Sequence, residues 1–93
     1  MNYDIKFTKG RFYIEDFNGK MIAEVTYVEQ YGDTLHLDHT FVDESLRGQG
    51  VAKMLVDKVV ELARKENKVI FPKCPYARSL FERKDEYDDV FKR

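Results

Sequence analysis

The sequence has no tryptophan, one cysteine, two histidines and no long apolar run in its 93 residues. The lone Cys74 excludes an internal disulfide and a cysteine-rich metal site, and His36 and His39 are too few to hold zinc without other ligands, so we expect no metal cofactor. No segment approaches the roughly 20 apolar residues of a membrane-spanning helix. The first residues are mixed polar and predict no signal peptide, so we expect a cytoplasmic protein without a membrane partner.

The remaining composition is typical of a small globular protein. Hydrophobic residues make up 43% of the chain and charged residues 35%, a balance that favours a packed core over disorder. The length predicts a single domain over residues 1–93, and we expect a monomer. The net charge of −1 does not suggest a nucleic-acid partner. Residues 1–47 hold five basic and nine acidic side chains, whereas residues 48–93 hold eleven and eight, so an anionic ligand suits the second half better.

Alternating and β-branched residues in the first 42 positions predict a meander of three or four antiparallel strands. In chain order these are Tyr3–Thr8, which is the weakest, Arg11–Phe17, Met21–Val28 and Thr34–Val42. Asn18-Gly19 and Gly32-Asp33 supply the turns. Regular alternation in the last strand places Leu35, Leu37, His39 and Phe41 on one face and His36, Asp38, Thr40 and Val42 on the other.

The apolar period becomes helical from Gly50 onward. One face of the predicted helix, which runs to residue 66 and stops at Asn67, carries Val51, Leu55, Val59, Leu62 and Ala63. A buried strand at Val69–Phe71 then lies parallel to its predecessor across the helix, and Tyr76–Arg83 forms a second helix. The fold class is therefore α+β or α/β: an antiparallel β-meander followed by strand, loop, helix, strand and helix on a mixed sheet.

Two glycines in the loop before the long helix indicate an anion site. Gly48 and Gly50 allow the backbone to turn tightly and approach a ligand, and Arg47 adds a positive charge beside them. The free N–H groups of the first helical turn attract negative charge. The segment lacks the Gly-Lys-Ser/Thr of a Walker loop and the three glycines of a dinucleotide fingerprint. A strand-to-helix connection without any ligand has the same spacing, so the loop alone leaves both interpretations open.

The segment R-G-Q-G-V-A at residues 47–52 resembles the Q/R-x-x-G-x-G/A signature of the GNAT acetyltransferases, in which this loop holds the pyrophosphate of coenzyme A. The order of elements around it is similar, and A-R-S-L-F-E-R resembles the region after the fifth strand of that family. H-T-F-V, R-G-Q-G-V-A and P-K-C-P-Y together look like a GNAT-like subfamily of about this chain's length in bacteria and plants. Those proteins lack the helices between the first two strands that help to shape the acceptor site.

The resemblance implies a GNAT-like fold with splayed central strands and acetyl-CoA as the cosubstrate. Carried over position by position, it assigns acetyl-CoA contacts to Phe41, Val42, Arg47, Gly48, Gln49, Gly50, Val51, Ala52, Lys53, Cys74 and Tyr76. It also implies an open acceptor site that is broad in selectivity or completed by a partner, because this chain has no room for the missing helices.

Two positions depart from the family pattern. Phe81 stands where many members have a tyrosine that protonates the leaving thiolate, so that assignment does not transfer, and Tyr76 or Tyr87 would have to replace it. Cys74 stands where many members have an asparagine. It is a buried structural thiol, a lining residue of the acetyl pocket, or a nucleophile activated by Lys73 and the following helix.

The candidate catalytic residues are therefore Cys74 and His39. His39 is either a hydrogen-bonded histidine of the sheet or a general base, a role that suits histidine as a residue type because free imidazole titrates near neutral pH. The leading hypothesis is an acetyl-CoA-dependent N-acetyltransferase acting on an unknown amine or protein acceptor. An acetyl-CoA-binding protein with little transferase activity, and an interaction module that uses the fold as a scaffold, are the alternatives.

Overall fold

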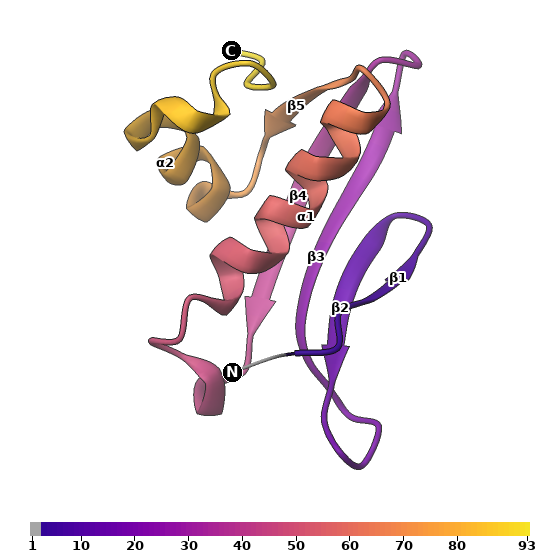
Figure 1. Ribbon diagram of the computed structural model, residues 1–93, viewed down its shortest axis with the longest axis vertical. Coiled ribbons are helices and arrows are strands. Elements are labelled where there is room, and N and C mark those ends of the chain that lie inside the picture. The colour runs from indigo at the N-terminus through magenta and orange to yellow at the C-terminus, as the bar shows by residue number, and fades with distance from the viewer. Residues whose placement is uncertain (1–2) are drawn as a thin grey trace.

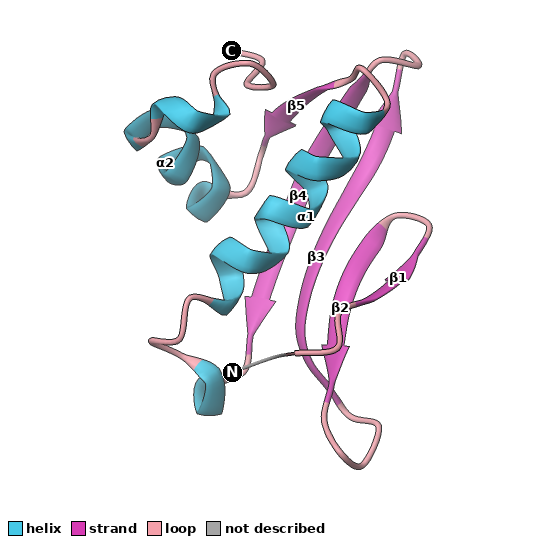
Figure 2. Cartoon of the chain, viewed as in Figure 1, coloured by secondary structure: helices cyan, strands magenta, loops and turns pink. Residues whose placement is uncertain are grey.

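The computed structural model describes residues 3–93. These residues form one five-stranded sheet, in the order β1-β2-β3-β4-β5, with two α-helices (Figures 1 and 2). The elements are β1 (Lys6–Thr8), β2 (Arg11–Glu15), β3 (Met21–Gln30), β4 (Thr34–Val42), α1 (Val51–Lys65), β5 (Val69–Pro72) and α2 (Pro75–Arg83), with short 3-10 turns η1 (Glu44–Leu46) and η2 (Asp85–Tyr87). Within the described part of the chain, no helix is long and apolar enough to cross a bilayer.

The predicted mixed sheet is confirmed. β1 to β4 pair antiparallel with their neighbours, and β4 pairs parallel with β5 through the α1 crossover. The second strand is two residues shorter than predicted, because the Asp16 carboxylate accepts the N–H groups of Asn18 at 2.8 Å and Lys20 at 2.9 Å. These bonds begin the hairpin turn before Phe17, which is fully exposed at its tip.

A β-bulge divides β4 and corrects the predicted faces of that strand. Thr26 pairs with His39 and Tyr27 pairs with Leu37, so Asp38 is an extra residue without a partner on β3. An extra residue reverses the alternation that follows it. The prediction that His39 and Phe41 share a face with the buried Leu35 and Leu37 is therefore wrong, and Thr40 and Val42 take that face instead.

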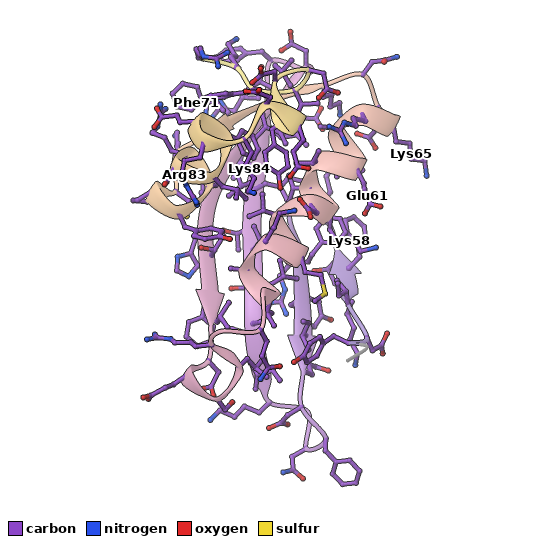
Figure 3. All side chains as sticks on the ribbon, turned by 60° about the vertical axis from the view of Figure 1, so that its left-hand side comes forward. Lys58, Glu61, Lys65, Phe71, Arg83 and Lys84 are labelled. Carbon is purple, nitrogen blue, oxygen red and sulfur yellow. The ribbon has the colours of Figure 1, made fainter. Side chains whose placement is uncertain are left out.

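Helix α1 packs along one face of the sheet and closes the core. Its six fully buried residues are Val51, Leu55, Val56, Val59, Val60 and Ala63, and they meet the buried residues of β3 and β4. Leu62 was predicted in this set but is only half-buried. The opposite side of α1 carries Lys58, Glu61 and Lys65 outward (Figure 3). The predicted helix stop is confirmed: α1 ends at Lys65, and Asn67 has a left-handed φ of 56°.

The C-terminal segment covers the second side of α1 and the outer edge of β5. Phe91 forms a parallel bridge with Ile70, whose N–H donates to Val90 O at 2.7 Å. Tyr87, Val90 and Phe91 are all buried, as their apolar character predicts. This extra cover explains why the apolar surface of α1 is wider than a single stripe, since Val60 is buried on the side where it and Tyr87 line one pocket.

The turn between β3 and β4 stores backbone strain. Tyr31 is 89% exposed and has a φ of 61°, in the left-handed region that is unfavourable for a bulky L-residue. We expect Tyr31→Asn to raise the free energy of unfolding by about 0.5–1 kcal/mol, because asparagine tolerates this conformation. Urea denaturation measures the change. Tyr31→Phe keeps the strained backbone and loses only the hydroxyl, so it should leave the urea midpoint unchanged. A similar increase in stability for both variants would show that backbone strain at residue 31 is not the cause.

Candidate functional site

The loop from β4 to α1 begins with a capped 3-10 turn. The Asp43 carboxylate accepts the backbone N–H of Ser45 at 3.0 Å and its hydroxyl at 2.6 Å. These hydrogen bonds hold the pKa of Asp43 below its usual range. The chain therefore leaves the sheet in a fixed direction and enters residues 47–50, all of which are exposed.

Gly48 and Gly50 give this loop a conformation that other residues disfavour. Their φ angles are 82° and 74°, and a Cβ added to either would meet no other atom within 4 Å among the described residues. Glycine is thus required by the backbone conformation and not by crowding from the protein. The space beside both glycines is open, so a ligand can approach the backbone directly.

Among the described residues, the backbone amides from Gly48 onward have no hydrogen-bond acceptor until the helical ladder begins. Gly50 O accepts the N–H of Met54 at 3.1 Å and starts the helical ladder, whereas no acceptor within the described chain takes the amides of residues 48–53. These unpaired donors lie at the N-terminus of a 15-residue helix. Free N–H groups at the positive end of a helix dipole form an anion site.

A pocket of about 220 Å³ opens at this helix start. It is lined by Val42, Leu46, Arg47, Gly48, Gly50, Val51, Ala52 and Tyr76. Gln49 lies in the same loop and accepts a hydrogen bond from the phenol of Tyr3, which ties the loop to the N-terminal segment. Burial raises the pKa of Tyr76, so its hydroxyl carries a proton at neutral pH.

The strands beside this pocket separate as predicted for a splayed sheet. Pairing of β4 with β5 ends at Leu37 and Pro72. Leu37 O then accepts the N–H groups of Lys73 at 2.9 Å and Cys74 at 3.1 Å, which turns the chain into α2. The β4 segment beyond Leu37 has β3 on one side and no strand on the other within residues 3–93. An extended ligand can therefore lie along this free edge of β4.

Cys74 lies at the point where the strands diverge. It is the N-cap of α2 and is 5% exposed, with its Sγ 3.3 Å from Oγ1 of Thr40. Thr40 and Cys74 are each two residues from a lining residue of the pocket, Val42 and Tyr76. The thiol thus lies just beyond the lining of this pocket, between β4 and the N-terminus of α2.

The bulge places both histidines on the open face of the sheet, opposite α1. His39 pairs with Thr26 and His36 pairs with Val28, which lies two positions further along β3. The prediction that His36 and His39 lie on opposite faces is therefore wrong. His39 is exposed, whereas His36 is half-buried, and its ring centroid lies 5.4 Å from that of Phe71. The Nδ1 atom of His36 is buried and has no hydrogen-bond partner among the described residues.

Four of the predicted acetyl-CoA contacts do not line this pocket: Phe41, Gln49, Lys53 and Cys74. Lys53 pairs with Asp57 at 3.0 Å and Glu86 at 3.4 Å on the outer side of α1, and does not line the pocket. The side chain of Phe41 is on the open face, so only its backbone borders the free edge of β4. Phe81, at the position of the family's acid, is buried in an aromatic cluster.

The sequence did not predict three residues that lie at the candidate site. Leu46 lines the pocket, Thr40 contacts Cys74, and Tyr3 binds Gln49. The apolar Leu46 in an otherwise polar loop was a usable signal. Thr40 was hidden by the bulge, and the contact of Tyr3 joins residues 46 positions apart, which no local pattern encodes.

The comparisons with known proteins agree with this geometry. The model of the GCN5-related N-acetyl-transferase family matches residues 11–90. The chain belongs to this family. Among solved structures, this GNAT protein is similar to a GCN5-like protein from Staphylococcus aureus, with 40% identity and a TM-score of 0.83 over 98% of this chain and 89% of that one. No curated protein matches it.

Larger GNAT structures share the fold at lower identity. An acetyltransferase from Bacillus cereus is 22% identical, with a TM-score of 0.63 over 76% of this chain and 54% of that one. Rv2747 from Mycobacterium tuberculosis, crystallised in complex with CoA, is 21% identical, with a TM-score of 0.59 over 69% of this chain and 40% of that one. This GNAT chain spans about half the length of these neighbours.

Proposed function

We propose that the protein is an acetyl-CoA-dependent N-acetyltransferase. The observation that carries this proposal is the set of unpaired amides at residues 48–53, beside two glycines that leave open space. They would hold the pyrophosphate, and Arg47 would add a charge-assisted contact at the rim. The pantetheine arm would lie along the free edge of β4 and bring the thioester to Cys74.

The residues around the thioester support transfer in two steps. In the first, the Cys74 thiolate forms a bond to the acetyl carbon, and the thiolate of CoA departs with the electron pair of the broken C–S bond. Tyr76, which is protonated at neutral pH, supplies the proton to that thiolate. In the second, the acceptor amine would bond to the acetyl carbon at the free edge of β4, and the C–S bond to Cys74 would break with its electron pair returning to the sulfur. His39, on the open face, would take the amine proton, and solvent would return a proton to Tyr76.

A protein that binds acetyl-CoA without efficient transfer is the second candidate. One observation favours it: Phe81 has no ionisable proton and is 1% exposed in the core, so the family's usual acid is missing. We call Arg47 and the unpaired amides of residues 48–53 the cradle. In this case the cradle would hold the pyrophosphate as in the first proposal, and Cys74 would only line the acetyl end of the site.

Two measurements separate these functions. Isothermal titration with acetyl-CoA should show binding, and absence of binding at millimolar ligand would remove both candidates. A CoA-release assay with a panel of amines, polyamines and lysine peptides should then show turnover for at least one acceptor. Binding without any release across the panel would favour the second candidate.

The contribution of Arg47 provides a smaller test. Arg47 is exposed in the loop, so Arg47→Ala should weaken acetyl-CoA binding by about 1 kcal/mol, the scale of one exposed charge-assisted hydrogen bond. Titrations at low and high salt measure this loss, which should shrink as salt screens the charge. Lys65→Ala, at the far end of α1, is the matched control and should change nothing. A loss for Arg47→Ala that is independent of salt would rule out a direct electrostatic contact.

A further inference from the structure

Helices α1 and α2, whose N-termini border the candidate site, are joined further along their lengths by side chains that lie outside it. The N-terminus of α1 carries the unpaired amides, and the N-terminus of α2 carries Cys74. Under the proposed function, on which this inference rests, one acetyl-CoA molecule spans both ends. The separation of α1 from α2 therefore decides whether a pyrophosphate held at one helix brings the thioester to the thiol at the other.

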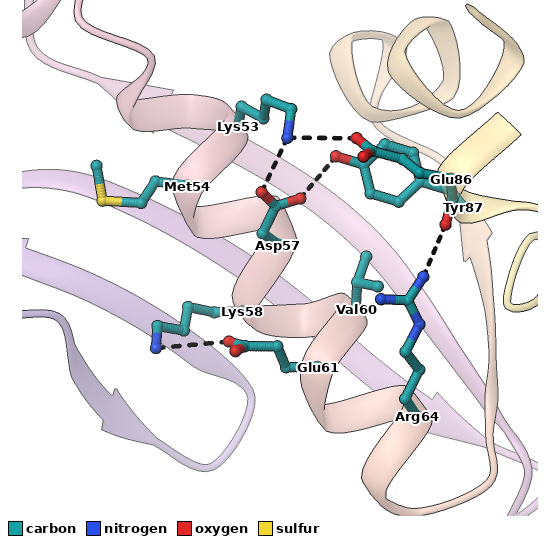
Figure 4. A pocket seen from close by; sticks show the side chains of 9 residues that line it. All are labelled: Lys53, Met54, Asp57, Lys58, Val60, Glu61, Arg64, Glu86 and Tyr87. Atoms are coloured by element: carbon teal, nitrogen blue, oxygen red, sulfur yellow. Dashed lines mark hydrogen bonds and ion pairs between the residues drawn. The ribbon is translucent and has the colours of Figure 1, made fainter. Parts of the chain in front are cut away.

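A chain of three side chains connects these helices. The ring of Phe81, on α2, stacks on Tyr87 with centroids 4.7 Å apart and planes 17° apart. The Tyr87 hydroxyl donates to the Asp57 carboxylate, on α1, at 2.6 Å. Figure 4 shows this hydrogen bond, with Lys53 bound to the other oxygen of Asp57 at 3.0 Å. We call Phe81, Tyr87 and Asp57 the strut.

The strut is rigid for physical reasons. Phe81 and Tyr87 are 1% and 2% exposed, so neither ring has space to turn aside. Burial and the Asp57 carboxylate both raise the pKa of Tyr87, so its hydroxyl remains a donor throughout the physiological range. The ring of Phe91 packs edge-on against the ring of Phe81, with their centroids 5.4 Å apart, and adds a third ring to this cluster. A short hydrogen bond to a charged acceptor then fixes the rings to α1.

We propose that Tyr87 is a positioning residue of the acetyltransferase site. Through Phe81 and Asp57 it sets the separation between the N-termini of α1 and α2, and with it the register between the pyrophosphate and thioester ends of acetyl-CoA. Tyr87 does not line the pocket at the helix start, so its effect is indirect. Phe81, which lacks the acid function of the family's tyrosine, has a packing role in this strut.

Binding of two ligands to Tyr87→Phe tests the proposal. This variant keeps the ring stack and loses only the hydrogen bond to Asp57. ADP carries a pyrophosphate but no pantetheine arm, so it engages the α1 end alone, whereas acetyl-CoA engages both ends. We expect the affinity for acetyl-CoA to fall about fivefold, the scale of one net hydrogen bond, and the affinity for ADP to stay unchanged. NMR titration measures both affinities on the folded protein.

Two further variants sharpen the result. Tyr31→Phe removes a hydroxyl from an exposed turn and should leave both affinities unchanged. In an Asp57→Ala background, Tyr87→Phe should cause no additional loss, because the hydrogen bond is already absent. Equal losses of affinity for both ligands, or no loss for either, would overturn the proposal that Tyr87 positions the two helices. If the wild type binds neither acetyl-CoA nor ADP, the proposed function fails first and removes the basis of this inference.

Discussion

Gly50→Val should weaken acetyl-CoA binding by at least tenfold, about 1.4 kcal/mol, and Gly48→Val should have a similar effect. The open space beside each glycine is the space that the proposed pyrophosphate occupies, and a β-branched side chain would fill it. The left-handed φ at both positions adds a cost of about 1–2 kcal/mol that the loop would relieve by turning its amides away. Isothermal titration of the folded variants measures the loss.

Gly32 provides a matched control for this experiment. It has a φ of 75°, close to the 74° of Gly50, and a Cβ there would also meet no atom within 4 Å of the described chain. Gly32 precedes β4, whereas the cradle follows it, so the two glycines lie at opposite ends of that strand. Gly32→Val should therefore lower stability without changing the affinity for acetyl-CoA. Normal binding by both cradle variants would show that the loop does not hold the pyrophosphate.

Incubation with acetyl-CoA should leave one acetyl group on Cys74, and Cys74→Ser should abolish this adduct while acetyl-CoA still binds. The thiol lies at the divergence of β4 and β5, beside Thr40 and at the N-terminus of α2, where the proposed thioester would reach it. Mass spectrometry of the intact protein and of its peptides detects and locates the adduct. Because the chain has a single cysteine, the location is unambiguous.

Two further measurements decide what the adduct means. His39→Gln should still form the adduct but should pass the acetyl group to amines about a hundredfold more slowly, the lower end of the range for a lost general base. Saturating CoA should protect Cys74 of the wild type from iodoacetamide. A thiol that is inert with and without CoA, and that never carries an acetyl group, would mark Cys74 as a structural residue and leave direct attack by the amine as the remaining route.

The fold was predictable wherever the local pattern decides the structure. Strand Thr34–Val42 was predicted with its observed bounds, and helix α1 to within one residue at each end, because strict periods of two and 3.6 residues specify them. The cradle was predictable for a similar reason, since Gly48 and Gly50 mark a conformation that only the local sequence sets. The side of β4 that faces the site was not predictable, because the bulge at Asp38 arises from pairing with β3.

Long-range contacts account for the other differences. Lys53 was expected at the phosphates, but Asp57 lies one turn along the same helix face and Glu86 arrives from the C-terminal segment, so the ammonium is held away from the pocket. Burial of Tyr87, Val90 and Phe91 followed from their apolar character, yet the hydrogen bond from Tyr87 to Asp57 joins residues 30 positions apart. Composition indicated that the tail docks and gave no information about what it contacts.

The bulge in β4 would make the number of residues in this strand part of the proposed chemistry. Thr40 contacts Cys74 on one side of the sheet, and His39, its immediate neighbour, lies on the other, so the two chemical roles interleave residue by residue. Point substitutions would change one role at a time. A single insertion or deletion between residues 38 and 42 would shift the phase of the strand and exchange every side chain beyond it between the two sides. This segment should therefore tolerate substitutions far better than insertions or deletions.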